Sequence, residues 1–150
     1  MLLCEMTAYY RSVGKTLLEA LEDLYQEYGV YLDAQDNLYF EGLSGMETMK
    51  RLMRQLRDRP FTEMDGLRVR RLTDYQTSIQ KDLRTDAETA VTLPSSDVLA
   101  FQLEQDCSVI VRPSGTEPKI KVYYAVKGAD RVSAEQRVAS LKAFMADYVK

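Results

Sequence analysis

Seven residues, 112–118, connect two runs of the sequence that have the composition of β-strands. The run before them ends in Val109-Ile110-Val111, and the run after them extends from Lys119 to Val126 with apolar residues at every second position. This alternation is typical of a strand that buries one of its faces. A sheet would therefore hold both ends of the connection, so the chain must fold around a short turn that cannot relax into an open loop.

The same seven residues, Arg-Pro-Ser-Gly-Thr-Glu-Pro, carry groups that suit a phosphate. Arg112 offers a planar fork of donors, and Ser114 and Thr116 add hydroxyl donors. Gly115 lets backbone N–H groups approach an anion and can adopt a positive φ, while the two prolines stiffen the connection. An ordinary tight turn with a surface arginine is the alternative interpretation. Seven suitable residues in succession favour the anion site.

The alternation in the second run adds one candidate to this site. Lys121 is expected on the face opposite the apolar residues, where it could meet the same ligand as the turn. The predicted inward residues are Ile120, Val122, Tyr124 and Val126, and the predicted outward residues are Lys119, Lys121 and Tyr123.

Composition narrows the chemistry. The 150 residues include no histidine, which removes Ser-His and Cys-His nucleophile pairs and most transition-metal sites. Cys4 and Cys107 lie far apart and predict free thiols. The net charge of −3 argues against a nucleic-acid binder. No apolar run is long enough to span a membrane, and residues 1–3 are too short for a signal sequence, so we expect a cytoplasmic protein.

Four helices are predicted, and three of them begin with a capping-box pattern. The first extends from Leu2 to Ser12. The other three are predicted from Thr16 to Tyr28, from Ser44 to Arg57 and from Ser133 to Tyr148, with the boxes Thr16–Glu19, Ser44–Glu47 and Ser133–Gln136. Basic residues on the third helix could suggest nucleic-acid binding, but no aromatic residues alternate with them, so a solvated face is the better interpretation.

Four strands are predicted at residues 67–72, 98–103, 108–112 and 119–126, with a mobile surface loop at 73–92. Residues 30–39 are interpreted as two short strands around a turn, and Asp33, Asp36 and Asn37 in that turn lack the spacing of a calcium loop. The fold class is therefore α+β: a four-stranded antiparallel sheet flanked by two helices, preceded by a short helical tail of another domain. We expect this tail at residues 1–40 and the main domain at 41–150.

The segments Arg112–Tyr124 and Leu93–Leu99 resemble the C-terminal domain of the α-D-phosphohexomutases, most closely the bacterial phosphoglucomutase/phosphomannomutase branch. The resemblance extends upstream through Cys4–Leu17 and Tyr28-Gly29, which look like the last helices of the family's third domain. It covers nearly the whole chain and is weakest at residues 76–92.

This resemblance implies that the turn grips the phosphate of the sugar phosphate that is not being transferred, through Arg112, Ser114, Gly115 and Thr116, with Lys121 as a weaker candidate. Family members move a phosphoryl group between the 1- and 6-positions of a hexose through a bisphosphorylated intermediate. The serine loop, the magnesium loop and the sugar-reading loop belong to the first three domains of the family. The resemblance therefore implies a magnesium ion and a hexose bisphosphate for the full-length parent, no catalytic residue or cofactor in this chain, and no activity for this chain alone.

Two other functions are possible from the sequence. A free-standing, non-catalytic phosphosugar-binding module would account for the initiating methionine. Nucleic-acid binding through the third helix is a distant third. On the first interpretation the partners are a phosphosugar and the missing N-terminal domains of the same polypeptide, with no nucleic acid and no membrane.

Overall fold

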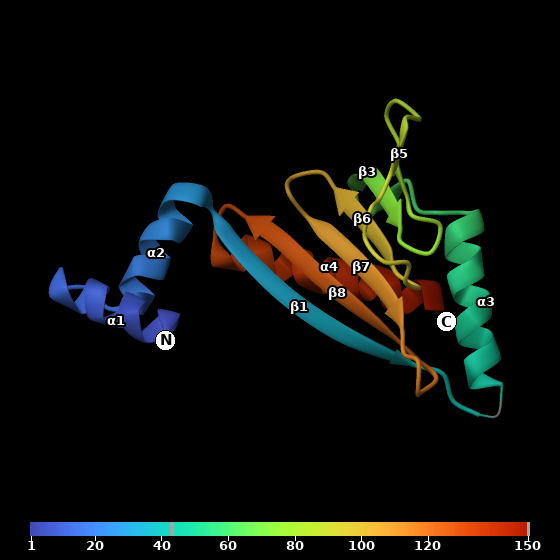
Figure 1. The fold of residues 1–150 in the computed structure, drawn as a ribbon, viewed down its shortest axis with the longest axis horizontal. Helices are drawn as coiled ribbons and strands as arrows, with labels where there is room; N and C mark the ends of the chain where they lie inside the picture. Colours follow the sequence, from blue (N-terminus) through green and yellow to red (C-terminus); the bar gives the residue numbers. More distant parts are fainter. Residues whose placement is uncertain (43, 150) are drawn as a thin grey trace.

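The computed structural model describes residues 1–42 and 44–149, in which helices and strands follow one another from end to end. Figure 1 shows this arrangement. The elements are α1 (Leu2–Ser12), α2 (Leu17–Tyr28), β1 (Val30–Tyr39), α3 (Gly45–Asp58), β2 (Glu63–Met64), β3 (Leu67–Asp74), β4 (Ile79–Asp82), β5 (Glu88–Ala90), β6 (Leu99–Leu103), β7 (Ser108–Pro113), β8 (Lys119–Gly128) and α4 (Arg131–Val149).

The strands form one antiparallel sheet in the order β1-β8-β7-β6-β3-β4-β5, with β2 paired to β3. The predicted α+β class is confirmed, because helices accompany an antiparallel sheet. The predicted strand number was wrong, since the described residues form eight strands and not four. The additional strands are β1, β2, β4 and β5, all of which come from segments with weak or interrupted apolar alternation.

Residues 30–39 form a single strand, so the prediction of two short strands around a turn was wrong. All ten residues of β1 pair with β8, from Val30 opposite Gly128 to Tyr39 opposite Lys119. The interpretation of Asp36 as a turn residue failed because its carboxylate faces α4, where it accepts a 2.7 Å hydrogen bond from Lys142 Nζ. The division of the chain at residue 40 remains a prediction, and β1 lies within the sheet.

The segment predicted as a loop at 73–92 also contains strands. Residues 79–82 pair with β3 on one side and with residues 88–90 on the other. Most side chains of this hairpin are exposed or half-buried, so the sequence carries no apolar alternation that would indicate a strand.

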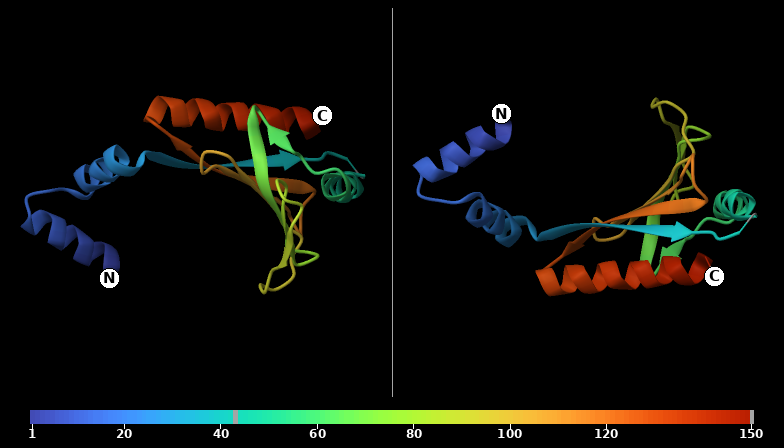
Figure 2. Two further views of the ribbon diagram at one scale, coloured as in Figure 1. Left: turned by 90° about the horizontal axis from the view of Figure 1, so that it is seen from above. Right: turned by 90° about the horizontal axis from the view of Figure 1, so that it is seen from below.

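The core lies between one face of the sheet and the helices α3 and α4. Figure 2 shows α4 along that face, with α3 at the end of the sheet where β1 terminates. The inward residues of β8 follow the predicted alternation: Ile120, Val122, Tyr124 and Val126 are all buried. Among the described helices, none lies over the opposite face of the sheet (Figure 2), which leaves that face open beside the candidate site.

The helices α1 and α2 extend away from the sheet (Figure 1). Helix α1 has no buried residue, and α2 buries only Ala20. The predicted apolar stripe of α2 is largely exposed, including Leu21, Leu24 and Tyr28. No described helix is long and apolar enough to cross a membrane.

The three predicted capping boxes had different outcomes. The box of Thr16 with Glu19 is present. Ser44 precedes α3, but its side chain makes no capping hydrogen bond. Ser133 takes part in a reciprocal pair, but as the partner of Asp130 one turn earlier, because α4 begins at Arg131.

Candidate functional site

The connection between β7 and β8 is a hairpin turn whose backbone is fixed at both ends. Lys119 closes it twice, since its carbonyl oxygen accepts a 2.9 Å hydrogen bond from Ser114 N and its N–H donates to Glu117 O at 2.8 Å. A third bond, 2.8 Å from Phe40 N to Pro118 O, ties the turn to the end of β1. The turn is therefore a rigid projection at one end of the sheet.

Helix α3 begins directly against this turn. A Cβ atom added at Gly45 would clash with the carbonyl oxygen of Phe40 and would lie 3.0 Å from Pro118 Cβ. Only glycine leaves room for this close approach. Pro118 is thus held between β1 and the start of α3, which limits how far the turn can move.

Within this fixed turn, several donors remain available. Among the described residues, the backbone N–H groups of Gly115, Thr116 and Glu117 have no hydrogen-bond acceptor, and the hydroxyls of Ser114 and Thr116 have no partner. Gly115 itself does not adopt the positive φ that its residue type allows, and the space where its Cβ would lie is open. Its contribution is therefore access to the backbone and not an unusual conformation.

Arg112 and Lys121 face each other across the pair of strands. They are register partners of β7 and β8, so their side chains project from the same face of the sheet. Neither forms a hydrogen bond or an ion pair with the described part of the chain. Two cations directly opposite each other destabilise a sheet unless an anion compensates them. The structure thus brings all five sequence-predicted site residues, Arg112, Ser114, Gly115, Thr116 and Lys121, to one turn and its flanking strands.

Glu117 forms its ion pair with Lys119 and not with Arg112 or Lys121. The hydrogen bond from Lys119 lowers the pKa of the Glu117 carboxyl, and the charge of Lys121 lowers it further. The same contact with Glu117 raises the pKa of the Lys119 ammonium. The Lys119 Nζ atom also lies 5.4 Å from the centroid of the Tyr39 ring. Sequence reasoning placed Lys119 on the correct face of the strand. It missed the contact between Lys119 and Tyr39, because that contact depends on the register of β1 against β8.

Two hollows in the described part of the surface lie away from the turn. One of about 610 Å³ lies beside Gly29 and Gly128, at the other end of β8. Another, of about 360 Å³, lies on the open face of the sheet between Thr73, Gln102 and Ile110. The candidate site is instead a group of donors on a projecting turn. This geometry suits a binding site that a second domain completes.

Comparison with known proteins points to one family. The profile described as "Phosphoglucomutase/phosphomannomutase, C-terminal domain" matches residues 64–143. A phosphoglucomutase of Staphylococcus aureus (strain bovine RF122 / ET3-1) is 34% identical over 128 residues, which cover 85% of this chain and 23% of that protein. A phosphoglucomutase of Staphylococcus epidermidis (strain ATCC 12228 / FDA PCI 1200) is 34% identical over 125 residues, 83% of this chain and 23% of that protein.

A solved structure shares the fold. The open form of the exocytosis-sensitive phosphoprotein pp63/parafusin, a phosphoglucomutase from Paramecium, matches with a TM-score of 0.52 and 13% identity, over 89% of this chain and 23% of that one. This chain therefore spans about a quarter of the length of the relatives it matches. It belongs to the phosphoglucomutase/phosphomannomutase C-terminal domain family.

Proposed function

We propose that this chain is the substrate-phosphate-binding domain of a phosphoglucomutase/phosphomannomutase, and that its 112–118 turn grips the phosphate that is not being transferred. One observation carries the proposal: a rigid turn presents unpartnered N–H groups, two unpartnered hydroxyls and an unpaired guanidinium at the same place. These are the groups that surround a phosphate in a backbone nest completed by an arginine fork.

The charge of the site supports a dianionic ligand. Arg112 and Lys121 repel each other across the strands until an anion lies between them. Each charge-assisted hydrogen bond contributes about 1.5–3 kcal/mol, whereas association costs about 4–15 kcal/mol in lost freedom. A turn exposed on one domain would therefore bind a sugar phosphate weakly, and tighter binding would need contacts from another part of the protein.

For the parent enzyme, we propose reversible conversion of hexose 1-phosphate and hexose 6-phosphate by intramolecular phosphoryl transfer, through a hexose bisphosphate. A clamp on the distant phosphate would hold either end of the sugar at the reacting centre, so that remote binding energy orients the substrate. Within residues 1–42 and 44–149, no three potential ligand side chains gather to hold a metal ion. We propose that other domains of the parent enzyme hold the magnesium ion, as the family resemblance implies, and we expect this chain alone to be inactive.

We also propose that α1 and α2 belong to the end of a preceding domain and that their partner is the remainder of the same polypeptide. Their exposed apolar side chains support this, because Leu18, Leu21 and Leu24 are at least 40% exposed and would be covered by an adjoining domain. The cytoplasmic location stays a prediction.

The turn can be tested by titrating the ¹⁵N-labelled chain with glucose 1-phosphate and following its amide resonances. We expect the largest shifts at Gly115, Thr116 and Glu117, with a dissociation constant in the millimolar range or weaker. Arg112→Ala should weaken binding by about tenfold or more, the equivalent of one charge-assisted hydrogen bond.

Arg54→Ala is the matched control, because Arg54 is an exposed arginine on α3. It should leave the titration unchanged. Shifts centred elsewhere, or binding that survives Arg112→Ala, would refute the assignment of the site. Micromolar binding at the turn would instead favour a free-standing phosphosugar-binding module.

A further inference from the structure

The turn contains one group that works against phosphate binding. Glu117 lies within the 112–118 connection, and its backbone N–H is one of the proposed phosphate donors. The Glu117 side chain is 54% exposed, and its carboxylate lies close enough to Lys121 for the two charges to interact. An unpaired carboxylate at this position would repel a phosphate dianion and would compete with it for Lys121 and Arg112.

The structure resolves this conflict through Lys119. Its ammonium forms the ion pair with Glu117, and only 14% of the Lys119 side chain is exposed, so the group is much less free than an ordinary surface lysine. The ring of Tyr39, its register partner on β1, lies 5.4 Å from Nζ and supports it by a cation–π contact. The backbone of Lys119 is also fixed, since it makes both hydrogen bonds that close the turn.

We infer that Lys119, supported by Tyr39, is a positioning residue that engages the Glu117 carboxylate and so keeps Arg112 and Lys121 available to a phosphate. Four charged side chains lie at the turn. Lys119 holds the Glu117 carboxylate, and Arg112 and Lys121 have no ion-pair partner among the described residues. The inference rests on the proposed function of the turn and assigns a role to two residues, Lys119 and Tyr39, that do not themselves need to touch the ligand.

The test is a double-mutant cycle at Glu117 and Lys119, with inorganic phosphate as the probe and the amide shifts of Gly115 and Thr116 as the readout. Lys119→Met keeps the length of the side chain and releases the carboxylate. We expect it to weaken phosphate binding by about 3- to 10-fold, the size of a partly screened charge effect. Lys119→Arg should retain the ion pair and bind phosphate as the unaltered chain does.

A second substitution distinguishes a positioning role of Lys119 from direct contact between Lys119 and phosphate. Glu117→Gln in the Lys119→Met background removes the released carboxylate, so phosphate affinity should return to that of the unaltered chain or exceed it. A double variant that stays as weak as Lys119→Met would overturn the inference, because Lys119 would then contribute as a ligand. A Lys119→Met variant with unchanged affinity would overturn it as well.

The two proposals fail in different ways. If the turn amides of the unaltered chain do not respond to phosphate, the proposed function fails and the positioning role fails with it. If they respond and Lys119→Met makes no difference, only the positioning role fails. Thermal unfolding of every variant, measured alongside, should show midpoints close to that of the unaltered chain, because the ion pair is exposed at Glu117 and contributes little to stability.

Discussion

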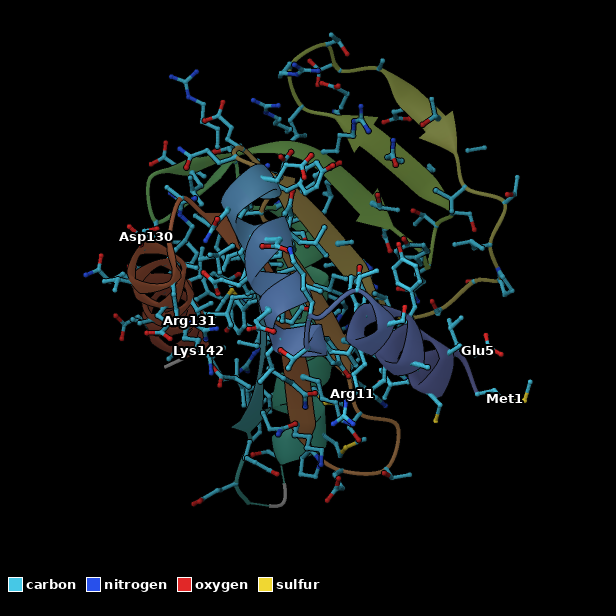
Figure 3. The ribbon with its side chains drawn as sticks, turned by 90° about the vertical axis from the view of Figure 1, so that its left-hand side faces the viewer. Met1, Glu5, Arg11, Asp130, Arg131 and Lys142 are labelled. Carbon is cyan, nitrogen blue, oxygen red and sulfur yellow. The ribbon has the colours of Figure 1, made fainter. Side chains whose placement is uncertain are left out.

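The turns at the two ends of β8 have similar composition, but one satisfies its polar groups within the protein and the other does not. At the end that leads into α4, Asp130 Oδ1 accepts from Ser133 N at 2.7 Å, and Ser133 Oγ accepts from Asp130 N at 3.1 Å. Arg137 donates to the carbonyl oxygen of Lys127 at 2.8 Å. Figure 3 shows Asp130 and Arg131 at this end of α4. Here each of these polar groups has a partner within the protein.

At the opposite end of β8, the 112–118 turn uses the same kinds of group and leaves them without acceptors among the described residues. Serine, glycine and a basic residue occur at both ends, so residue type alone does not distinguish a turn that satisfies its own donors from one that leaves them without acceptors. What distinguishes them is whether the chain supplies the acceptors itself. A site for an anion is a place where the donors are fixed and the acceptor is missing.

The largest expected effect concerns the two glycines. A Cβ atom at Gly128 would lie 2.6 Å from Ala134 N and 2.8 Å from Asp130 O, whereas at Gly115 nothing lies within 4 Å. Gly128→Ala should therefore lower the free energy of unfolding by about 2–3 kcal/mol, the cost of overpacking against backbone. Gly115→Ala should leave stability unchanged and weaken glucose 1-phosphate binding. Urea unfolding measures the free energy of unfolding of both variants. Equal losses of stability would contradict the proposed difference between the two turns.

Replacing Arg137 and replacing Arg112 should also have different effects on stability. Arg137→Ala removes a charged donor from a half-buried carbonyl oxygen and should lower the free energy of unfolding by about 1–2 kcal/mol. Arg112→Ala removes an unpaired cation opposite Lys121, so stability should be unchanged or slightly higher. Thermal unfolding of the two variants decides the matter, and a destabilised Arg112→Ala would mean that the guanidinium has a structural role.

Another unpartnered donor sharpens the comparison, because it is buried. Tyr124 is 1% exposed, and its hydroxyl has no partner among the described residues. Burial raises the pKa of this hydroxyl, and the charge of Asp36 raises it further. Tyr124→Phe should raise the free energy of unfolding by about 1 kcal/mol, since a buried donor without a partner carries a desolvation cost. A loss of stability in chemical unfolding would show that the hydroxyl is satisfied.

The smallest expected effect is the pH dependence of stability that arises from Asp130, in the turn that leads into α4. Hydrogen bonds from Ser133, first from its backbone and then from its side chain, lower the pKa of Asp130 below its ordinary value of 3.8. A lowered pKa means that the ionised cap stabilises the folded state at every pH above 3.8 and loses this contribution as the pH falls through the folded-state pKa. The stability difference between the unaltered chain and Asp130→Ala should be constant above that value and shrink below it. A difference that grows in acid would contradict this.

Sequence reasoning succeeded where the signal was local. The four helices were predicted from apolar spacing within single segments. The roles of the five site residues stay a prediction, although the structure places these residues in or beside one turn. It failed where the determinant is distant in sequence. β1 was divided because Asp36 interrupts its apolar face, and the lysine that compensates this carboxylate lies on α4, 106 residues later.

The hairpin of β4 and β5 was missed for a different reason. Its residues are exposed or half-buried on both faces, so backbone pairing defines these strands and apolar alternation does not. The contact of Lys119 with Tyr39 likewise required the register of two strands separated by most of the chain.

The unbroken course of β1 has a mechanical consequence. Its ten residues run from Gly29, at the end of α2, to the turn, a span of about 33 Å at 3.3 Å per residue. Gly29 adopts φ 89° where the helix meets the strand. Because no joint interrupts the strand, a rotation of about 10° around Gly29 would carry the turn through about 6 Å relative to α1 and α2 over a lever of this length. Small angular adjustments near the N-terminal helices are thereby converted into displacements as large as a phosphate group.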